Sequence, residues 1–488
     1  MVHGSKGSPS NNSGRAGVGP SSGRTAVRVR FAPSPTGILH IGNIRTALFN
    51  WLFAKHVGGE FLLRIEDTDK ARSEKRHEKE ILEGLKWLGL EWDNKKLIRQ
   101  SERGDIYKGY LERLLKDGHA YYCFCSAEEL EAERQAQLSQ GLPPKYGGKC
   151  RRIDSEAAVK KAKSEPAVIR FKIPTTQGHF QDIVRGKVAY NGDLLGDIII
   201  AKGLDKPLYN FAVVVDDREM EITHVIRGED HLSNTQKQIF IQDALGFPRP
   251  HYAHLPLILG PDRKKLSKRY LDKSLLDYKK SGYLQEAMIN FLVLLGWHPV
   301  EDREIIFVDD VIKEFTLDRV QKGGAVFNPE KLDWLNSFYM KGASDEKILE
   351  LIKPLVPALW LKKKDFLLKV FSIEKSRIKN LSEFSSIAGF FFELPEYPAN
   401  ELLWKNTPKD KIKSNLRKIL ETLKNQKNIP GAQESITRFA DEEGRGEVFW
   451  PLRVALSGRD ASPSPLEIMD VIGIKEAMSR VRKAIKKL

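Results

Sequence analysis

The chain has 488 residues, 41% of them hydrophobic, so it is too long for one hydrophobic core and should form several folded domains. No stretch approaches about 18 consecutive apolar residues, which excludes a membrane-spanning helix, and three cysteines exclude a disulfide framework and indicate a reducing compartment. The net charge of +15 favours a polyanionic partner such as nucleic acid, although charges that only maintain solubility would give the same sum.

Residues 1–26 form a distinct N-terminal segment. They are rich in Gly, Ser, Asn and Pro and lack the apolar stretch that a secretory signal needs. The composition predicts a disordered tail. Together with the low cysteine content, it also predicts a cytoplasmic protein.

The first folded segment, residues 27–65, has the pattern of one parallel βαβ unit. Alternating apolar residues at 27–31 predict a strand, and two prolines and a glycine then impose a loop. Helical apolar spacing begins at residue 44, ends at a Gly-Gly pair, and leads into a strand at 60–65. The unit is typical of a nucleotide-binding half but lacks the GxGxxG and GxxxxGK[ST] motifs. His40 and Gly42 stand where backbone N–H groups at a helix start would meet phosphate.

An insertion is predicted after this unit. Amphipathic helices are expected at residues 73–90 and 105–117, and the composition then changes. Short strands are expected at 167–173, 187–190 and 197–201. We interpret residues 120–208 as a domain inserted into the nucleotide-binding fold.

All three cysteines lie in this insertion, as Cys123, Cys125 and Cys150. A CxC pair followed about two dozen residues later by a third cysteine has the form of a zinc knuckle, because Zn²⁺ takes four sulfur or nitrogen ligands from short arms. The competing interpretation is three buried thiols that pack as small hydrophobic side chains. Two arginines follow Cys150, so a fourth ligand is not evident.

The segment from Tyr209 to Asp217 is apolar and ends in two carboxylates, and we interpret it as a buried parallel strand. Ligands of open α/β sheets bind beyond the carboxyl ends of the strands. We therefore expect Asp216, Asp217 and the polar segment 227–231 to lie near His40.

The sequence beyond residue 254 contains a short basic segment, which is followed by mostly helical patterns. A strand predicted at 255–259 precedes the segment Lys-Leu-Ser-Lys-Arg at 265–269, which alone would be an ordinary solvated loop. A helix is predicted at 284–295, and nearly everything beyond residue 345 shows helical spacing. No coiled-coil heptads are present, so we expect a monomer.

The segments around His40 and Lys268 together resemble the paired HIGH and KMSKS signatures of class I aminoacyl-tRNA synthetases. RFAPSPTG at 30–37, RIEDTD at 64–69 and VVDDREMEITHVIRGEDH at 214–231 narrow the resemblance to glutamyl-tRNA synthetases of bacterial type. The HIGH-like motif comprises Pro33, Ser34, Pro35, Thr36, Gly37, Ile38, Leu39, His40, Ile41, Gly42 and Asn43. The KMSKS-like motif comprises Lys265, Leu266, Ser267, Lys268 and Arg269.

The resemblance covers residues 27–488 and implies an architecture. It consists of a Rossmann-like α/β catalytic domain, an inserted α+β domain that binds the tRNA acceptor end, a stem-contact region, and all-α anticodon-binding domains. The corresponding residues are 27–119 with 209–265, then 120–208, 266–330 and 331–488. The implied reaction joins L-glutamate to tRNA(Glu), with ATP and Mg²⁺.

The resemblance also implies a set of site residues. His40 and Lys268 would be catalytic. The residues implied for ATP are His40, Gly42, Asn43, Asp230, Lys265, Ser267 and Lys268, and those implied for glutamate are Arg30, Ala32, Ser34, Glu66, Tyr209 and Arg227. Arg30 would pair with the side-chain carboxylate and reject glutamine, because a neutral amide would leave the guanidinium without a charged partner. Glu66 would bind the substrate ammonium.

Three positions need comment. Some members of the family carry Asn at the position of Val213 and Trp at that of His231, so these two contacts are not expected here. The related glutamyl-Q synthetases have a Tyr-x-x-x-Cys arm, which makes Tyr146 the candidate fourth zinc ligand.

Alternatives within and outside the family remain. Glutaminyl-tRNA synthetases typically read PPEPNG where residues 32–37 stand here, and glutamyl-Q synthetases lack the helical C-terminal third. A non-discriminating enzyme would also charge tRNA(Gln). A catalytically silent tRNA-binding paralogue should have lost motif residues, whereas His40, Glu66, Arg227 and Lys268 are all present.

Overall fold

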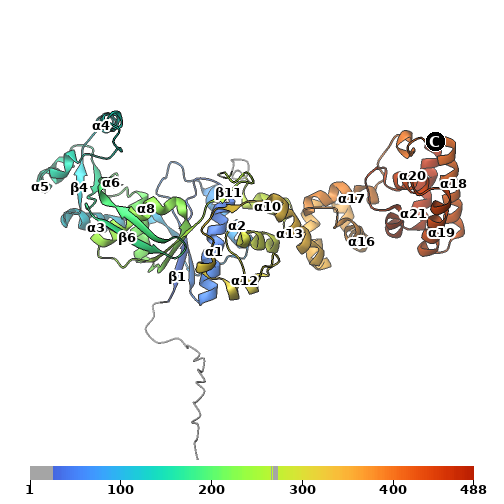
Figure 1. The fold of residues 1–488 in the computed structure, drawn as a ribbon, viewed down its shortest axis with the longest axis horizontal. Helices are drawn as coiled ribbons and strands as arrows, with labels where there is room; N and C mark the ends of the chain where they lie inside the picture. Colours follow the sequence, from blue (N-terminus) through green and yellow to red (C-terminus); the bar gives the residue numbers. More distant parts are fainter. Residues whose placement is uncertain (1–25, 265, 267–272) are drawn as a thin grey trace, which may run out of the picture.

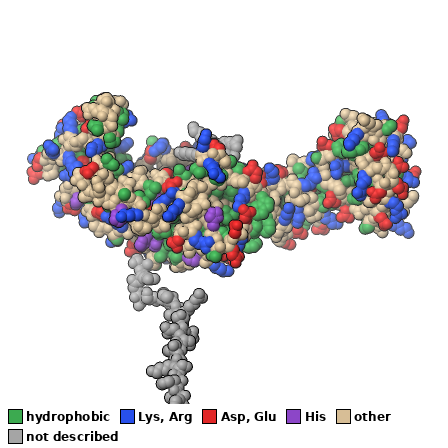
Figure 2. Space-filling model, viewed as in Figure 1, with side chains coloured by type: hydrophobic (Ala, Val, Ile, Leu, Met, Phe, Trp, Pro, Cys, Tyr) green, Lys and Arg blue, Asp and Glu red, His purple; other side chains and the backbone are tan. Residues whose placement is uncertain are grey.

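The computed structural model describes residues 26–264, 266 and 273–488 (Figure 1). Residues 1–25 of the predicted tail therefore lie outside the described residues, as do Lys265, Ser267, Lys268 and Arg269. The molecule is elongated, with the inserted segment at one end, the α/β part beside it and the C-terminal helices at the other end. Basic and acidic side chains are interspersed along the whole face shown in Figure 2.

The predicted βαβ unit is present. Strand β1 (Arg28–Phe31) pairs in parallel with β2 (Glu60–Ile65), and helix α1 (Ile41–Val57) connects them. The helix ends at Gly58, whose φ of 67° is left-handed and therefore suits glycine. Helix α2 (Lys75–Trp87) follows, and β3 (Ile98–Arg99) extends the sheet beyond β2.

A second group of parallel strands lies beside β1. Strands β9 (His224–Gly228) and β10 (His251–Leu255) are parallel, and the Thr223 N–H donates to the Arg28 carbonyl (3.0 Å), which places β9 next to β1. Helix α8 (Leu232–Ala244) connects β9 to β10. The carboxyl ends of β1 and β9 therefore open at one edge of the molecule's parallel sheet.

The inserted segment contributes to two sheets. Strands β4 (Ala120–Cys123), β5 (Val168–Phe171) and β8 (Ile198–Ala201) form an antiparallel sheet. The hairpin of β6 (Gln177–Asp182) and β7 (Gly186–Asn191) instead joins the sheet of β9 and β10, because β6 pairs with β10 at Asp182 and Tyr252. The helices near this segment are α3 (Gly104–Lys116), α4 (Ala127–Ser139), α5 (Ser155–Lys161) and α6 (Gly192–Leu195).

The strand predicted from Tyr209 to Asp217 is wrong. These residues begin helix α7 (Tyr209–Glu219), in which every side chain from Phe211 to Asp217 is buried. A helix surrounded by protein on all sides gives the same unbroken apolar run as a buried strand, so periodicity could not separate them. The chain returns to the parallel sheet only at β9.

The C-terminal third is helical, as predicted. Short strands β11 (Ile258–Leu259) and β12 (Ala325–Val326) pair with each other in parallel. The helices that follow them or lie between them are α10 (Leu275–Lys280), α11 (Gln285–Leu294), α12 (Val308–Glu314), α13 (Pro329–Gly342), α14 (Asp345–Ile352), α15 (Ala358–Leu361), α16 (Lys364–Glu374), α17 (Phe384–Phe392), α18 (Lys409–Asn425), α19 (Ile429–Glu443), α20 (Arg445–Ser457) and α21 (Pro465–Lys487). In the part of the chain that is described, no helix has the length and apolarity needed to cross a membrane.

Candidate active site

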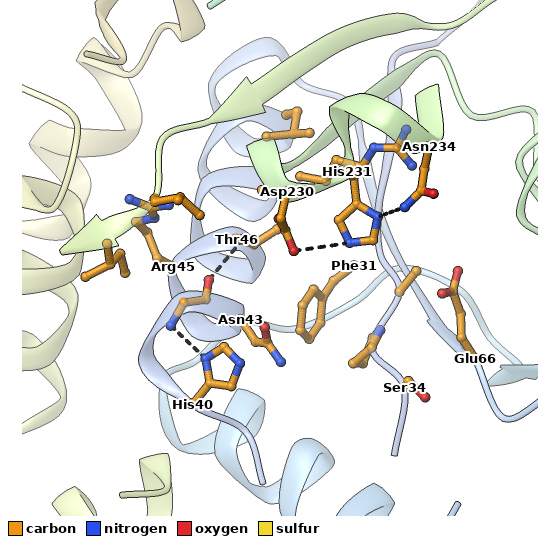
Figure 3. A pocket seen from close by; sticks show the side chains of 18 of the residues that line it. Phe31, Ser34, His40, Asn43, Arg45, Thr46, Glu66, Asp230, His231 and Asn234 are labelled. Atoms are coloured by element: carbon orange, nitrogen blue, oxygen red, sulfur yellow. Dashed lines mark hydrogen bonds and ion pairs between the residues drawn. The ribbon is translucent and has the colours of Figure 1, made fainter. Parts of the chain in front are cut away.

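A cavity of about 740 Å³ opens where β1, α1 and β9 meet (Figure 3). All described residues that the sequence implied for ATP or glutamate line this cavity. They are Arg30, Ala32, Ser34, His40, Gly42, Asn43, Glu66, Tyr209, Arg227 and Asp230. Leu266 of the KMSKS-like motif also lines it, so the one described residue of that motif lies beside the others.

His40 caps the N-terminus of α1. Its Nδ1 accepts a hydrogen bond from the Gly42 N–H (3.2 Å), and its backbone is extended, as N-cap residues require. Burial lowers the pKa of the imidazole, against the attraction of Asp230. The neutral tautomer that accepts at Nδ1 carries its proton on Nε2. His40 can therefore donate a hydrogen bond at the positive, N-terminal end of the α1 helix dipole.

Gly42 fits the space that His40 leaves. A Cβ at this position would lie 3.2 Å from one ring carbon of His40 and 3.3 Å from Nδ1. Thr46, one turn later, donates to the Gly42 carbonyl (3.0 Å), and both residues line the cavity. A larger residue at 42 would therefore displace the capping imidazole.

Arg45 is a cavity residue that the motifs did not identify. Its Nη1 donates to the Leu295 carbonyl (3.0 Å) and its Nη2 to the Pro256 carbonyl, while burial lowers its pKa to about 10. The position three residues after Gly42 on α1 was the available signal, since residues three apart share a helix face. Arg45 joins the motif helix to the segment that follows β10.

Asp216 and Asp217 do not line the cavity, contrary to the sequence prediction. As residues of α7 rather than a strand end, they lie in a buried ionic cluster behind it. Asp217 accepts from Arg30 Nε (3.1 Å) and Arg64 Nη1 (2.8 Å). Asp216 accepts from Arg103 Nε (2.7 Å). The two carboxylates thus fix arginines instead of contacting a ligand.

Arg30 and Glu66 are the parts of this cluster that reach the cavity. Arg30 presents its Nε and Nη2 edge to Asp217, and Arg64 Nη2 donates to Glu66 Oε1 (2.9 Å). Burial raises the pKa of Glu66 above its usual value, although Arg64 acts in the opposite direction. A further cation in the cavity would therefore stabilise the ionised form of Glu66.

Arg227 differs from the buried arginines Arg30 and Arg64. Its Nη2 donates to Thr235 Oγ1 (2.6 Å) and Gln238 Oε1 (2.7 Å), and its Nη1 is buried without a partner. Among the described residues it forms no ion pair, whereas Arg30 and Arg64 each pair with a carboxylate. A buried cation with only neutral partners leaves a charge for an anionic ligand to compensate.

Three further side chains line the cavity together with Arg227. The Tyr209 hydroxyl lies 3.0 Å from His231 Nδ1, and Asn234 Nδ2 lies 3.3 Å from the same nitrogen. Burial and the charge of Arg227 lower the pKa of His231 to about 4, so the ring is neutral near pH 7. His231 stands where some members of the family carry Trp, and it lines the cavity. Val213, which stands where some members carry Asn, is buried inside α7 and does not line the cavity.

A second cluster lies in the inserted segment. Cys125 Sγ is 3.6 Å from Cys150 Sγ, and Tyr146 Oη is 3.5 Å from the sulfurs of both Cys123 and Cys125. The three sulfurs lie within 4.8 Å of one another. Burial opposes ionisation of Cys123, but hydrogen bonds that include one from Tyr146 lower its pKa overall. The sequence-predicted ligands are therefore brought together.

Comparisons with known proteins agree with this geometry. Residues 26–334 match the family model described as tRNA synthetases class I (E and Q), catalytic domain, and residues 347–485 match an anticodon binding domain. The cavity at the start of α1 is thus part of a class I synthetase catalytic domain.

Individual relatives narrow the class. The chain is 44% identical to glutamate–tRNA ligase 2 of Thermoanaerobacter pseudethanolicus over 94% of this chain and 98% of that protein. It is 43% identical to glutamate–tRNA ligase of Thermodesulfovibrio yellowstonii over 94% and 99%. A crystal structure of a glutamate tRNA ligase from Elizabethkingia meningosepticum in complex with its amino acid is 36% identical, with a TM-score of 0.84 over 95% of this chain and 99% of that one. The chain belongs to the glutamate–tRNA ligase family, which confirms the resemblance seen in its motifs.

Proposed function

We propose that this chain activates L-glutamate with ATP and transfers the glutamyl group to the 3′ end of tRNA(Glu). The observation that carries the proposal is the buried guanidinium of Arg227, which has no carboxylate partner among the described residues and lines the same cavity as Glu66 and His40. A substrate with a carboxylate, an ammonium and a neighbouring phosphate would match these three groups.

The phosphates of ATP are proposed to lie at the N-terminus of α1. His40 donates from Nε2, and the helix dipole favours negative charge there. Charge develops on phosphate oxygens while the glutamate carboxylate attacks the α-phosphate, so fixed donors lower the barrier without a covalent protein intermediate. Mg²⁺, when bound, shields the remaining phosphate charge. Gly42, Asn43 and Asp230 complete the proposed nucleotide contacts, and Lys265, Ser267 and Lys268 are proposed to add the cationic loop.

Glutamate is proposed to lie between Glu66 and the two arginines. Glu66 binds the ammonium, and Arg227 with Arg30 binds the side-chain carboxylate, beside Tyr209. Glutamine has the same shape but a neutral amide, so it would leave the charge of Arg227 buried and uncompensated. Ala32 and Ser34, on the loop after β1, are proposed to line the remaining surface of the substrate.

The thiol cluster is proposed to hold one structural Zn²⁺ through Cys123, Cys125, Cys150 and Tyr146. Tetrahedral zinc with Zn–S bonds of about 2.3 Å places sulfur atoms roughly 3.8 Å apart and a sulfur and an oxygen roughly 3.5 Å apart. The separations of 3.6 Å and 3.5 Å fit these values. Zinc would fix the arm that carries Cys150 against β4.

Removal of the phenolic oxygen tests the zinc site. Tyr146→Phe is expected to lower the affinity for zinc about 10-fold or more, because a ligand is lost while the three thiolates remain. Metal content after dialysis against a weak chelator gives the measurement, and Tyr122→Phe on the same strand as Cys123 is the matched control. One zinc retained equally by all proteins would contradict Tyr146 as a ligand, and no zinc in the parent protein would favour three free thiols.

A further inference from the structure

A series of buried, hydrogen-bonded polar groups connects Arg227 to another part of the fold. His254 on β10 lies with Nε2 2.9 Å from Thr235 Oγ1 and 3.4 Å from Arg227 Nε. Its other ring nitrogen, Nδ1, is 2.6 Å from Asp182 Oδ2. Both His254 and Asp182 are completely buried. Asp182 is the last residue of β6, so the chain runs from the inserted hairpin to the candidate glutamate pocket.

The protonation of this pair is set by its surroundings. Burial lowers the pKa of His254, against the attraction of Asp182, so the ring is neutral. Burial opposes ionisation of Asp182, but hydrogen bonds from His254 and from the Arg185 backbone outweigh it and lower the pKa of Asp182. An ionised Asp182 can only accept, so the single ring proton of His254 stays on Nδ1.

The position of that proton matters for Arg227. With the proton on Nδ1, Nε2 offers a lone pair to the N–H groups of a guanidinium that pairs with no carboxylate in the part of the chain that the structure describes. With the proton on Nε2, an N–H group would face the guanidinium at 3.4 Å. The second arrangement loses an acceptor and adds repulsion at a buried cation, which would turn Arg227 away from its present position.

We propose that Asp182 and His254 are positioning residues of the glutamate pocket. Asp182 holds the His254 proton on Nδ1, His254 Nε2 accepts from Arg227, and Arg227 is thereby fixed with Nη1 free for a substrate carboxylate. This inference rests on the proposed function of Arg227 and names the residues that orient it. Neither Asp182 nor His254 lines the cavity, so they act through Arg227 and Thr235 alone.

A purely structural role is the competing explanation. Asp182 also accepts from the backbone N–H groups of Val184 (2.9 Å) and Arg185 (2.7 Å), and thus ties the turn between β6 and β7 to β10. Asp182→Asn separates the two roles. Its amide oxygen can still accept from the turn, whereas its NH₂ group faces His254 and moves the ring proton to Nε2.

Two substitutions of His254 give a matched pair. In His254→Asn the amide reaches the former Nδ1 position and keeps the link to Asp182, but offers nothing to Arg227. In His254→Gln the amide reaches the former Nε2 position and can accept from Arg227. Our proposal ranks Gln above Asn in glutamate use, whereas a structural role in the link to Asp182 ranks Asn above Gln.

The experiment is steady-state charging of a tRNA(Glu) transcript by the full-length protein, with glutamate and ATP varied separately. Asp182→Asn is expected to raise KM for glutamate about 10-fold or more and to change KM for ATP less than about twofold, as for residues that orient a ligand-binding side chain. In the double variant Asp182→Asn/His254→Gln, KM for glutamate should be no higher than in His254→Gln alone. Residue 254 then has no ring proton whose position Asp182 could set.

Three results would overturn the inference. They are an unchanged KM for glutamate in Asp182→Asn, better glutamate use by His254→Asn than by His254→Gln, and full additivity in the double variant. If Asp182→Asn does not fold, the two His254 variants decide, since both retain Asp182. Arg227→Gln separates the two proposals. A normal KM for glutamate in Arg227→Gln refutes the proposed role of Arg227 in glutamate binding, whereas a raised KM in Arg227→Gln beside an unchanged KM in Asp182→Asn refutes only the positioning role.

Discussion

Replacement of His40 by alanine is expected to slow glutamyl-adenylate formation by about 10²- to 10³-fold, the usual cost of removing one fixed donor from a developing anion. His40 accepts from Gly42 at Nδ1 and so directs its Nε2 proton toward the proposed phosphates. Pyrophosphate exchange in the presence of tRNA measures this step. The affinity for tRNA, measured by filter binding, should change little, because His40 lies inside the cavity at the start of α1.

A second variant separates chemistry from helix capping. Asparagine is a good N-cap residue and can accept from the Gly42 N–H, but it cannot donate from the position of Nε2. His40→Asn should therefore fold like the parent protein and remain nearly as slow as His40→Ala. Recovery of parental exchange in His40→Asn would mean that His40 serves only as a cap.

Replacement of Arg227 by glutamine is expected to lower kcat/KM for glutamate by about 10²- to 10³-fold, because truncation of one partner in a buried charged contact costs roughly 2–5 kcal/mol. Arg227 is buried in the cavity with only neutral protein partners among the described residues, as is Arg45, but the partners of Arg45 are backbone carbonyls, whereas those of Arg227 are side chains. The loss should appear mainly in KM for glutamate, with KM for ATP nearly unchanged, and it is measured by charging at varied glutamate concentration.

The control and the selectivity readout use the same assay. Arg218→Gln removes an arginine from the exposed side of α7 and should change kcat/KM less than about twofold. Arg227→Gln should also lose its preference for glutamate over glutamine, since the uncompensated charge is gone. A variant that keeps both affinity and preference would assign recognition of the side-chain carboxylate to Arg30 alone.

Local patterns allowed much of the fold to be predicted. The βαβ unit and the terminal helices depend on spacing within one element, and both are present in the structure, although α1 begins at Ile41 and not at residue 44. Helix α7 was not predictable in the same way, because burial on all sides removes the alternation that distinguishes a helix from a strand. Because the segment was predicted as a strand, Asp216 and Asp217 were expected near His40 and not in the buried ionic cluster.

The lining of the cavity could be predicted from motifs, but the support behind it could not. Arg30, Glu66 and Arg227 were named from the resemblance, and all three line the cavity. The pairing of Asp182 with His254 joins residues 72 positions apart that belong to no recognised motif. Such a contact follows from the docking of the β6–β7 hairpin onto β10, which no local pattern contains.

The most direct test of the central claim is charging of radiolabelled glutamate, with ATP and Mg²⁺, onto transcripts of tRNA(Glu) and tRNA(Gln). We predict charging of tRNA(Glu) that requires His40 and Arg227. Charging of tRNA(Gln) as well would define a non-discriminating enzyme with the same pocket. Charging of neither transcript, with tRNA binding intact, would contradict the account and indicate a catalytically silent tRNA-binding protein.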